Sequence, residues 1–115
     1  MKQKIKHPLL ASPSFIGNLE LKNRMVMAAM GSNFASEDGH ASEQLAAYYE
    51  ARARGGVGLI ILETSAISWP AGASKPNMIG FSKDEFVHSL HLLTERIHRH
   101  GAKITAQLNP RGKKD

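Results

Sequence analysis

The fold is decided by the stretch Val57-Gly58-Leu59-Ile60-Ile61-Leu62. A continuous apolar run of this kind, partly β-branched, is typical of a strand that is buried on both faces, as in parallel sheets. The run directly follows Gly55-Gly56, and glycine tolerates the left-handed conformation that commonly ends a helix. The sequence therefore predicts a helix that ends at these glycines and a buried strand after them.

A helix is predicted from Glu43 to Arg54, immediately before this strand. Ser42 stands at the N-cap position, where a side-chain oxygen can accept a hydrogen bond from a free backbone N–H. The apolar side chains that share one helix face, at i, i+4 and i+8, are Leu45, Tyr49 and Ala53. Upstream, the short apolar stretch 24–28 is predicted to be a strand, and the polar residues 31–41 a loop.

A second unit repeats this order. Residues 64–81 contain two prolines and two glycines and are predicted to form a long loop. The stretch Ser82-Lys83-Asp84-Glu85 has the S-x-x-E spacing of a capping box. A helix is predicted from there to His100, with Gly101 as its C-cap and a third strand at Lys103–Leu108. The apolar positions at helical spacing are Phe86, Leu90, Leu93 and Ile97.

The predicted order of elements is β-α-β-α-β, an α/β fold class whose crossovers are long enough for parallel strand pairing. Both long loops follow the carboxyl end of a strand, and ligands usually bind on that side of such folds. Three parallel strands with two helices would leave open sheet edges and an uncovered sheet face. Residues 1–115 are therefore expected to form one segment of a larger domain, which is incomplete as given.

Composition excludes several classes of protein. With 115 residues, of which 42% are apolar and 22% charged, the chain has the profile of a soluble globular segment. It has no apolar run near the roughly 20 residues of a membrane-spanning helix, and no secretory signal is expected. It has no cysteine, which excludes disulfides and thiolate metal sites. A cytoplasmic location is expected.

Charge and histidine patterns do not point to further partners. The net charge of +5 is concentrated at the two ends of the chain, whereas a nucleic-acid footprint clusters on one face; neither nucleic acid nor a membrane is a predicted partner. His88 and His91 share a helix face, but no third ligand stands nearby, so no metal site is predicted. Trp69, in the long loop, either meets a substrate or partner or simply packs.

Three groups of residues at predicted strand ends are candidates for ligand binding. They are Ala28-Ala29-Met30-Gly31, Glu63-Thr64-Ser65 and Gln107-Leu108-Asn109. Small residues let the backbone approach a flat ligand, and the Gln107 amide can donate to and accept from an edge such as a flavin pyrimidine. The alternatives are that the small residues only pack and that Gln107 caps a backbone group. Glu63 is either an acid or base, or a paired structural carboxylate.

Three stretches carry a resemblance to a known family. Residues 16–30 read IGNLELKNRMVMAAM, residues 48–61 read YYEARARGGVGLII, and residues 100–108 read HGAKITAQL. In this order they resemble the opening, the first helix with the second strand, and the third strand of the old yellow enzyme family. The match runs from Pro8 to Asn109, and parts of it are most similar to the larger dienoyl-CoA reductase and trimethylamine dehydrogenase branch.

The resemblance implies the N-terminal part of an FMN-binding (β/α)₈ TIM barrel. FMN would be the cofactor and NADH or NADPH the reductant, with hydride passed to an activated alkene or similar acceptor; an iron–sulfur cluster is implied only if the full-length protein belongs to the larger branch. The flavin ring would lie against Ala28, Ala29, Met30 and Gly31. Thr64 would approach the flavin, and Gln107 would hydrogen-bond its pyrimidine ring. No catalytic residue is carried over.

The sequence also departs from the family's pattern. Ala29 stands where proline is common, and Gly31 where threonine, serine or cysteine is common. Pro110 and Lys113 replace a histidine and an arginine, so that 110–115 is a divergent basic tail. Three hypotheses follow: a fragment that is inactive alone, one part of a split flavoenzyme that pairs with a complementary barrel fragment, or a non-enzymatic α/β interaction module.

Overall fold

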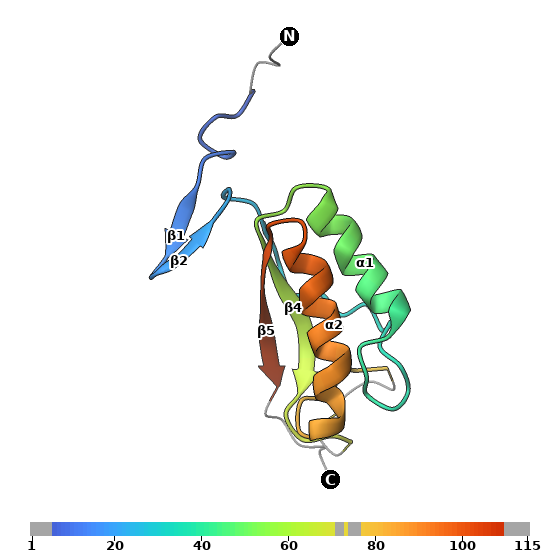
Figure 1. Ribbon diagram of the computed structural model, residues 1–115. Helices are drawn as coiled ribbons and strands as arrows, with labels where there is room; N and C mark the ends of the chain where they lie inside the picture. Colours follow the sequence, from blue (N-terminus) through green and yellow to red (C-terminus); the bar gives the residue numbers. More distant parts are fainter. Residues whose placement is uncertain (1–5, 71–72, 74–76, 110–115) are drawn as a thin grey trace.

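A computed structural model describes residues 6–70, 73 and 77–109. Its main body is a parallel sheet that two helices cover on one face (Figure 1). The strands are β3 (Val26–Met27), β4 (Leu59–Ala66) and β5 (Lys103–Asn109), in the order β3-β4-β5. The helices are α1 (Glu43–Arg54) and α2 (Val87–His98), which a short 3₁₀ turn η1 (Asp84–Phe86) precedes. The predicted α/β class, with three parallel strands and two helices, is confirmed.

Two strands differ in length from the prediction. The prediction places a strand over 24–28, but β3 comprises only Val26 and Met27, because only these two residues pair with β4. The prediction ends the next strand at Leu62, but β4 continues to Ala66. The strand is longer because its pairing with β5 resumes beyond a bulge: Leu62 pairs with Ala106 and Ser65 with Leu108, so that two residues of β4 face one of β5.

The core lies between the sheet and the helices. Ile60 and Leu62 of β4 are fully or almost fully buried, and they pack in one cluster with α1 and α2. The helix residues in this cluster are Leu45, Ala46, Tyr49, Ala53, Leu93 and Ile97. Each fully buried large apolar side chain contributes roughly 1.5–3 kcal/mol, so this layer provides most of the stability of the fold.

The predicted helix ends are confirmed at Ser42 and at Gly55-Gly56 and wrong at two positions. Ser42 Oγ accepts from the N–H of Leu45, 3.1 Å away, and Gly56 adopts positive φ after α1. The second helix is predicted to run to His100 with Gly101 as its C-cap, but α2 ends at His98 with Arg99 as its C-cap, and Gly101 has positive φ in the turn that follows. The capping box at Ser82 does not form, because Ser82 Oγ accepts instead from the N–H of Trp69 at 2.9 Å. The second helix therefore begins through η1 without a side-chain cap.

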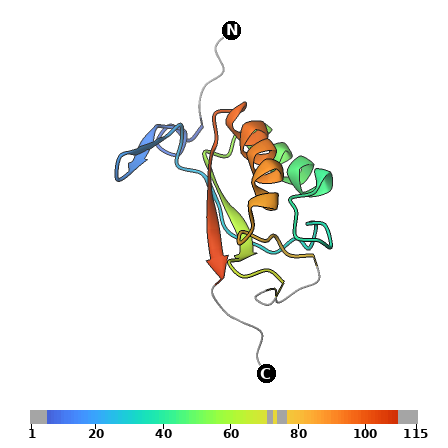
Figure 2. The same ribbon diagram turned by 60° about the horizontal axis from the view of Figure 1, so that its bottom comes forward.

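A hairpin that the sequence patterns above do not predict precedes the sheet. It consists of β1 (Ser14–Ile16) and β2 (Leu19–Leu21), joined by a two-residue turn in which Gly17 has a φ of 57°. The Gly-Asn pair between apolar residues is a hairpin signal that could have revealed it. The hairpin lies on the side of the sheet away from the helices (Figure 2), and Phe15 and Ile16 are exposed there.

The second face of the sheet carries no helix in the described part of the chain (Figures 1 and 2). Val26, whose neighbour Met27 packs against the helix-side core, is 48% exposed on this face. No helix among the described residues is long and apolar enough to cross a membrane. The basic tail 110–115 lies outside the described residues.

Candidate functional site

The bulge in β4 determines which face of the sheet each of two neighbouring side chains, Glu63 and Thr64, occupies. Glu63 and Thr64 both face Gln107 in the register. Because side chains alternate along a strand, an extra residue changes the direction of the side chains beyond it. Glu63 contacts Tyr49 of α1 on the covered face, whereas Thr64 contacts Gln107 on the open face. The bulge thus places a carboxylate among the helices and a hydroxyl on the open surface.

Thr64 and Gln107 form the polar centre of the open face. Thr64 Oγ1 donates to Gln107 Oε1 over 2.6 Å, and the Gln107 side chain is exposed. Since the amide oxygen accepts this hydroxyl, the amide NH₂ group can donate to a ligand on the open face. A hydrogen-bond acceptor on a planar ring, such as a carbonyl of a flavin pyrimidine, would be a suitable partner.

The small residues after β3 leave the sheet at the same end. Strand β3 pairs in parallel with β4, so the residues after it emerge beside the carboxyl half of β4. Ala28, Met30 and Gly31 are exposed and Ala29 is half-buried. They present backbone and little side-chain bulk, except at Met30, and the chain here can approach a flat ring closely. These residues could therefore lie against a flat ring.

Glu63 forms a buried polar cluster. Its side chain is 3% exposed, and Oε1 accepts from Tyr49 OH at 2.8 Å and from Ser32 Oγ at 2.6 Å. Burial, and then the neighbouring Glu63 carboxylate, raise the pKa of Tyr49, so the phenol remains a donor at neutral pH. The structure thus favours the paired structural carboxylate over an acid or base. Sequence reasoning missed Ser32 and Tyr49, because only the fold brings them to Glu63.

The two long loops are joined at the carboxyl end of the sheet. The N–H of Gly80 donates to the carbonyl of Gly39 over 2.8 Å, and Ala66 bonds to both neighbours of Gly80. Trp69 is half-buried and meets the Phe86 ring edge-on at 6.4 Å. A Cβ on Gly39 would lie 2.9 Å from the Trp69 ring, so Trp69 packs within these loops.

Known proteins similar to this chain are oxidoreductases by name. A family model described as the NADH:flavin oxidoreductase / NADH oxidase family matches residues 10–115. The NADH oxidase of Thermoanaerobacter brockii is 43% identical over 106 residues, which are 92% of this chain and 16% of that protein. The NADPH dehydrogenase of Halalkalibacterium halodurans is 38% identical over 111 residues, 96% of this chain and 32% of that protein.

Solved structures of related proteins superpose on this chain over most of its length. A variant of NCR from Zymomonas mobilis superposes with a TM-score of 0.80 at 34% identity, covering 92% of this chain and 33% of that one. Old yellow enzyme from Pichia sp. has a TM-score of 0.80 at 29% identity, covering 88% and 26%. The 2-naphthoyl-CoA reductase has a TM-score of 0.82 at 28% identity, covering 87% and 15%. The chain thus spans at most about a third of these relatives.

Proposed function

Because the chain belongs to the NADH:flavin oxidoreductase / NADH oxidase family, we propose that it forms the flavin-facing N-terminal part of an FMN-binding, NAD(P)H-dependent oxidoreductase. The observation that carries this proposal is the contact between Thr64 and Gln107, which leaves the amide NH₂ free to donate on the open face of the sheet. When bound, FMN supplies hydride transfer between a reduced nicotinamide and an acceptor such as an activated alkene.

The residues of this chain bind and orient the flavin in this proposal. Gln107 donates its N–H to an acceptor on the pyrimidine edge, and Thr64 holds the amide in that orientation. The backbone of 28–31 lies against the ring, where larger side chains would keep it away. We assign no catalytic residue to the chain.

A complementary barrel fragment is the partner that we propose for the chain. The outer edge of β5 pairs with no described strand, and Val26, whose neighbour Met27 packs against the core, is exposed on the open face. An unpaired strand edge can pair with a strand of another chain. A partner supplying such strands would exclude water from the open face and enclose the flavin. The isolated chain is therefore expected not to retain FMN at one equivalent.

The test measures FMN retention with and without a complementary fragment. The chain is purified alone and after co-expression with the part of the Halalkalibacterium halodurans NADPH dehydrogenase that lies C-terminal to its matched region. One equivalent of FMN in the complex alone is expected. A flavin-free complex, or no complex, would favour the non-enzymatic module or the inactive fragment.

A pair of variants tests the role of Gln107. In the complex with the complementary fragment, Gln107→Leu removes the amide donor and is expected to weaken FMN binding about threefold to tenfold, the equivalent of one hydrogen bond. Gln44→Leu, at an exposed position of α1, is the matched control and should bind FMN normally. Equal FMN affinity in both variants would contradict the assignment of Gln107.

A further inference from the structure

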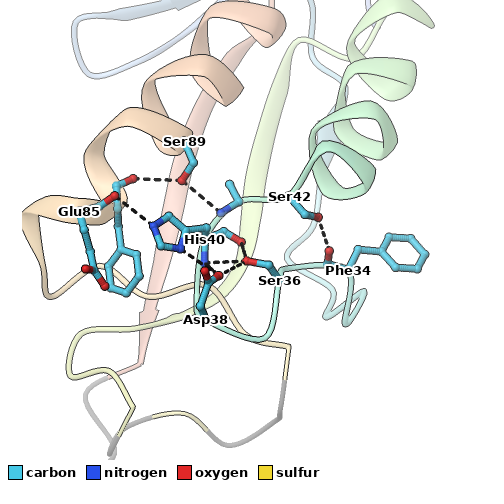
Figure 3. A network of polar contacts seen from close by, with 9 residues as sticks. Phe34, Ser36, Asp38, His40, Ser42, Glu85 and Ser89 are labelled. Carbon is cyan, nitrogen blue, oxygen red and sulfur yellow. Dashed lines mark hydrogen bonds and ion pairs between the residues drawn. The ribbon is translucent and has the colours of Figure 1, made fainter.

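His40 connects the loop after β3 to the beginning of the second helix (Figure 3). Its Nδ1 atom lies 2.9 Å from Asp38 Oδ1, and its Nε2 atom lies 3.2 Å from the backbone carbonyl oxygen of Glu85 in η1. The ring also meets Phe86 edge-on, with centroids 5.0 Å apart. A single imidazole therefore joins two segments that are 45 positions apart in the sequence.

Both polar partners of this imidazole are acceptors. A carboxylate and a backbone carbonyl offer no hydrogen to share, whereas a neutral imidazole has only one N–H. In either neutral tautomer one ring nitrogen would direct its lone pair at an oxygen. Only the doubly protonated imidazolium of His40 can interact favourably with Asp38 and with the Glu85 carbonyl together.

The contact with Asp38 depends on the charge of the ring. The Nδ1 atom is buried and has no well-aligned hydrogen-bond partner, although Asp38 Oδ1 lies 2.9 Å away. The interaction is therefore an ion pair more than a directed hydrogen bond. A neutral ring would lose most of this attraction.

The surroundings of His40 favour its charged form. The charged groups that act on the ring are both acidic: Asp38 on its own loop and Glu85 on η1. The side-chain contact with Asp38 is the largest effect on the ring and raises the pKa of His40 above its ordinary value of 6.5; burial opposes it, while the charge of Asp38 and the carbonyl and charge of Glu85 add to it. Asp38 is in turn held by Ser36, whose hydroxyl donates to Oδ1, and by the backbone N–H of His40.

We propose that His40 is a protonation-dependent anchor, which fastens the loop 31–41 to the beginning of α2 when the imidazole is charged and loosens this contact when the ring is neutral, while the Ala41 N–H still donates to Ser89 Oγ of α2. The loop bears the anchor at its end and, at its beginning, Gly31 and Ser32 beside the candidate site. Gly39, the residue before His40, bonds to Gly80 and lies against Trp69. Release of His40 therefore loosens the packing of Trp69.

The pH range of the anchor depends on both ionisable partners. A histidine whose pKa is raised by folding contributes stability below about pH 6.5, and the contribution is lost as the pH rises through the folded pKa. Asp38 has its pKa lowered from 3.8 to about 2, first by the Ser36 hydrogen bond and then by His40. Its contribution is present above pH 3.8 and is lost as the pH falls toward 2. The anchor is thus complete from about pH 4 to about pH 6.5.

The single tryptophan of the chain makes the anchor measurable. Trp69 emission is recorded from about pH 5 to about pH 9, a range that includes both an ordinary and a raised histidine pKa. We expect one transition to longer wavelength, because the ring becomes exposed as the loop is released. Its midpoint should lie above pH 6.5 and coincide with the titration of the His40 Cε1–H signal in NMR spectra.

Variants distinguish the anchor from a general pH effect. Asp38→Asn removes the negative charge and should move both midpoints to lower pH, whereas His40→Gln should abolish the emission transition. His88→Gln, at an exposed position of α2, is the matched control and should leave the transition unchanged. If His40→Gln does not fold, the wild-type titration and Asp38→Asn still decide the question.

Two results would overturn the proposal. One is a His40 signal that titrates at or below pH 6.5 in the wild-type chain. The other is Trp69 emission that stays constant while His40 titrates, or that keeps its midpoint in Asp38→Asn. These measurements need no flavin, so their outcome is independent of the test of FMN binding.

Discussion

The two faces of the sheet differ in their contacts. The covered face buries Ile60 and Leu62 against α1 and α2, and its one carboxylate, Glu63, is paired by hydrogen bonds. The open face presents Thr64 and Gln107, which bond to each other and leave an amide donor exposed. The same two strands supply both faces. The covered face therefore determines stability, while the open face can change its contacts without loss of the fold.

The largest difference in stability between variants of the two faces is expected when one core side chain is truncated. Leu62→Ala should lower the free energy of unfolding by about 2–5 kcal/mol, because it removes buried methyl groups and leaves a cavity. Thr105→Ala, at an exposed position of β5, is the control on the open face and should change it by less than about 0.5 kcal/mol. Urea unfolding followed by circular dichroism measures both; similar losses would show that the faces do not differ in this way.

A smaller loss of unfolding free energy is expected at the polar position of the covered face, where Tyr49 contacts Glu63. Tyr49→Phe removes the hydroxyl that donates to Glu63 and accepts from its backbone N–H. The buried carboxylate and N–H lose a partner, which costs about 1–3 kcal/mol. Tyr48→Phe is the matched control, since the Tyr48 ring is half-buried and contacts Arg52 through its face. Equal stability of the two variants would mean that the Tyr49 hydroxyl is not needed.

The contact between the helices should weaken in acid. Glu50 accepts from Arg96 at 2.9 Å and lies 3.0 Å from His100 Nε2, and these partners, His100 first, lower the pKa of its carboxyl group. Because the folded pKa is depressed, the stabilisation is present above about pH 4.5 and is lost as the pH falls through the folded value. Glu50→Gln should reduce the acid dependence of the unfolding temperature, whereas Glu95→Gln, an exposed control on α2, should not.

The smallest effect on stability is expected on the open face. Thr64→Val removes the hydroxyl that orients Gln107 and should change the free energy of unfolding by less than about 0.5 kcal/mol. In the proposed flavin complex the same change should weaken FMN binding, since the amide is free to turn its oxygen outward. A stability loss as large as that of Tyr49→Phe would show that this pair belongs to the fold and not to a site.

Local patterns were sufficient where one segment carries its own signal. The apolar run at 57–62 predicted β4, and Ser42 and Gly55-Gly56 marked the ends of α1 as the structure has them. Each of these signals involves residues within a few positions of one another. The capping box at Ser82 failed because a residue distant in the sequence, Trp69, uses the same hydroxyl oxygen.

The candidate site was predictable only in part. The sequence placed Thr64 and Gln107 at strand ends, and the structure brings them within 2.6 Å; their role toward a flavin stays a prediction, as does that of Ala28, Ala29, Met30 and Gly31. The bulge that separates Glu63 from Thr64 was not predictable, since it depends on how two strands that are distant in the sequence pair.

The order of the parallel strands and helices, the parallel class of the sheet and the family are readable from residue patterns, because apolar periodicity and glycine positions act over short distances along the chain. Which face Glu63 and Thr64 occupy, and which acceptors surround His40, was decided by the tertiary structure. The physical reason is that strand register and loop packing depend on contacts between distant segments. A single extra residue in the register changes the face on which a side chain lies.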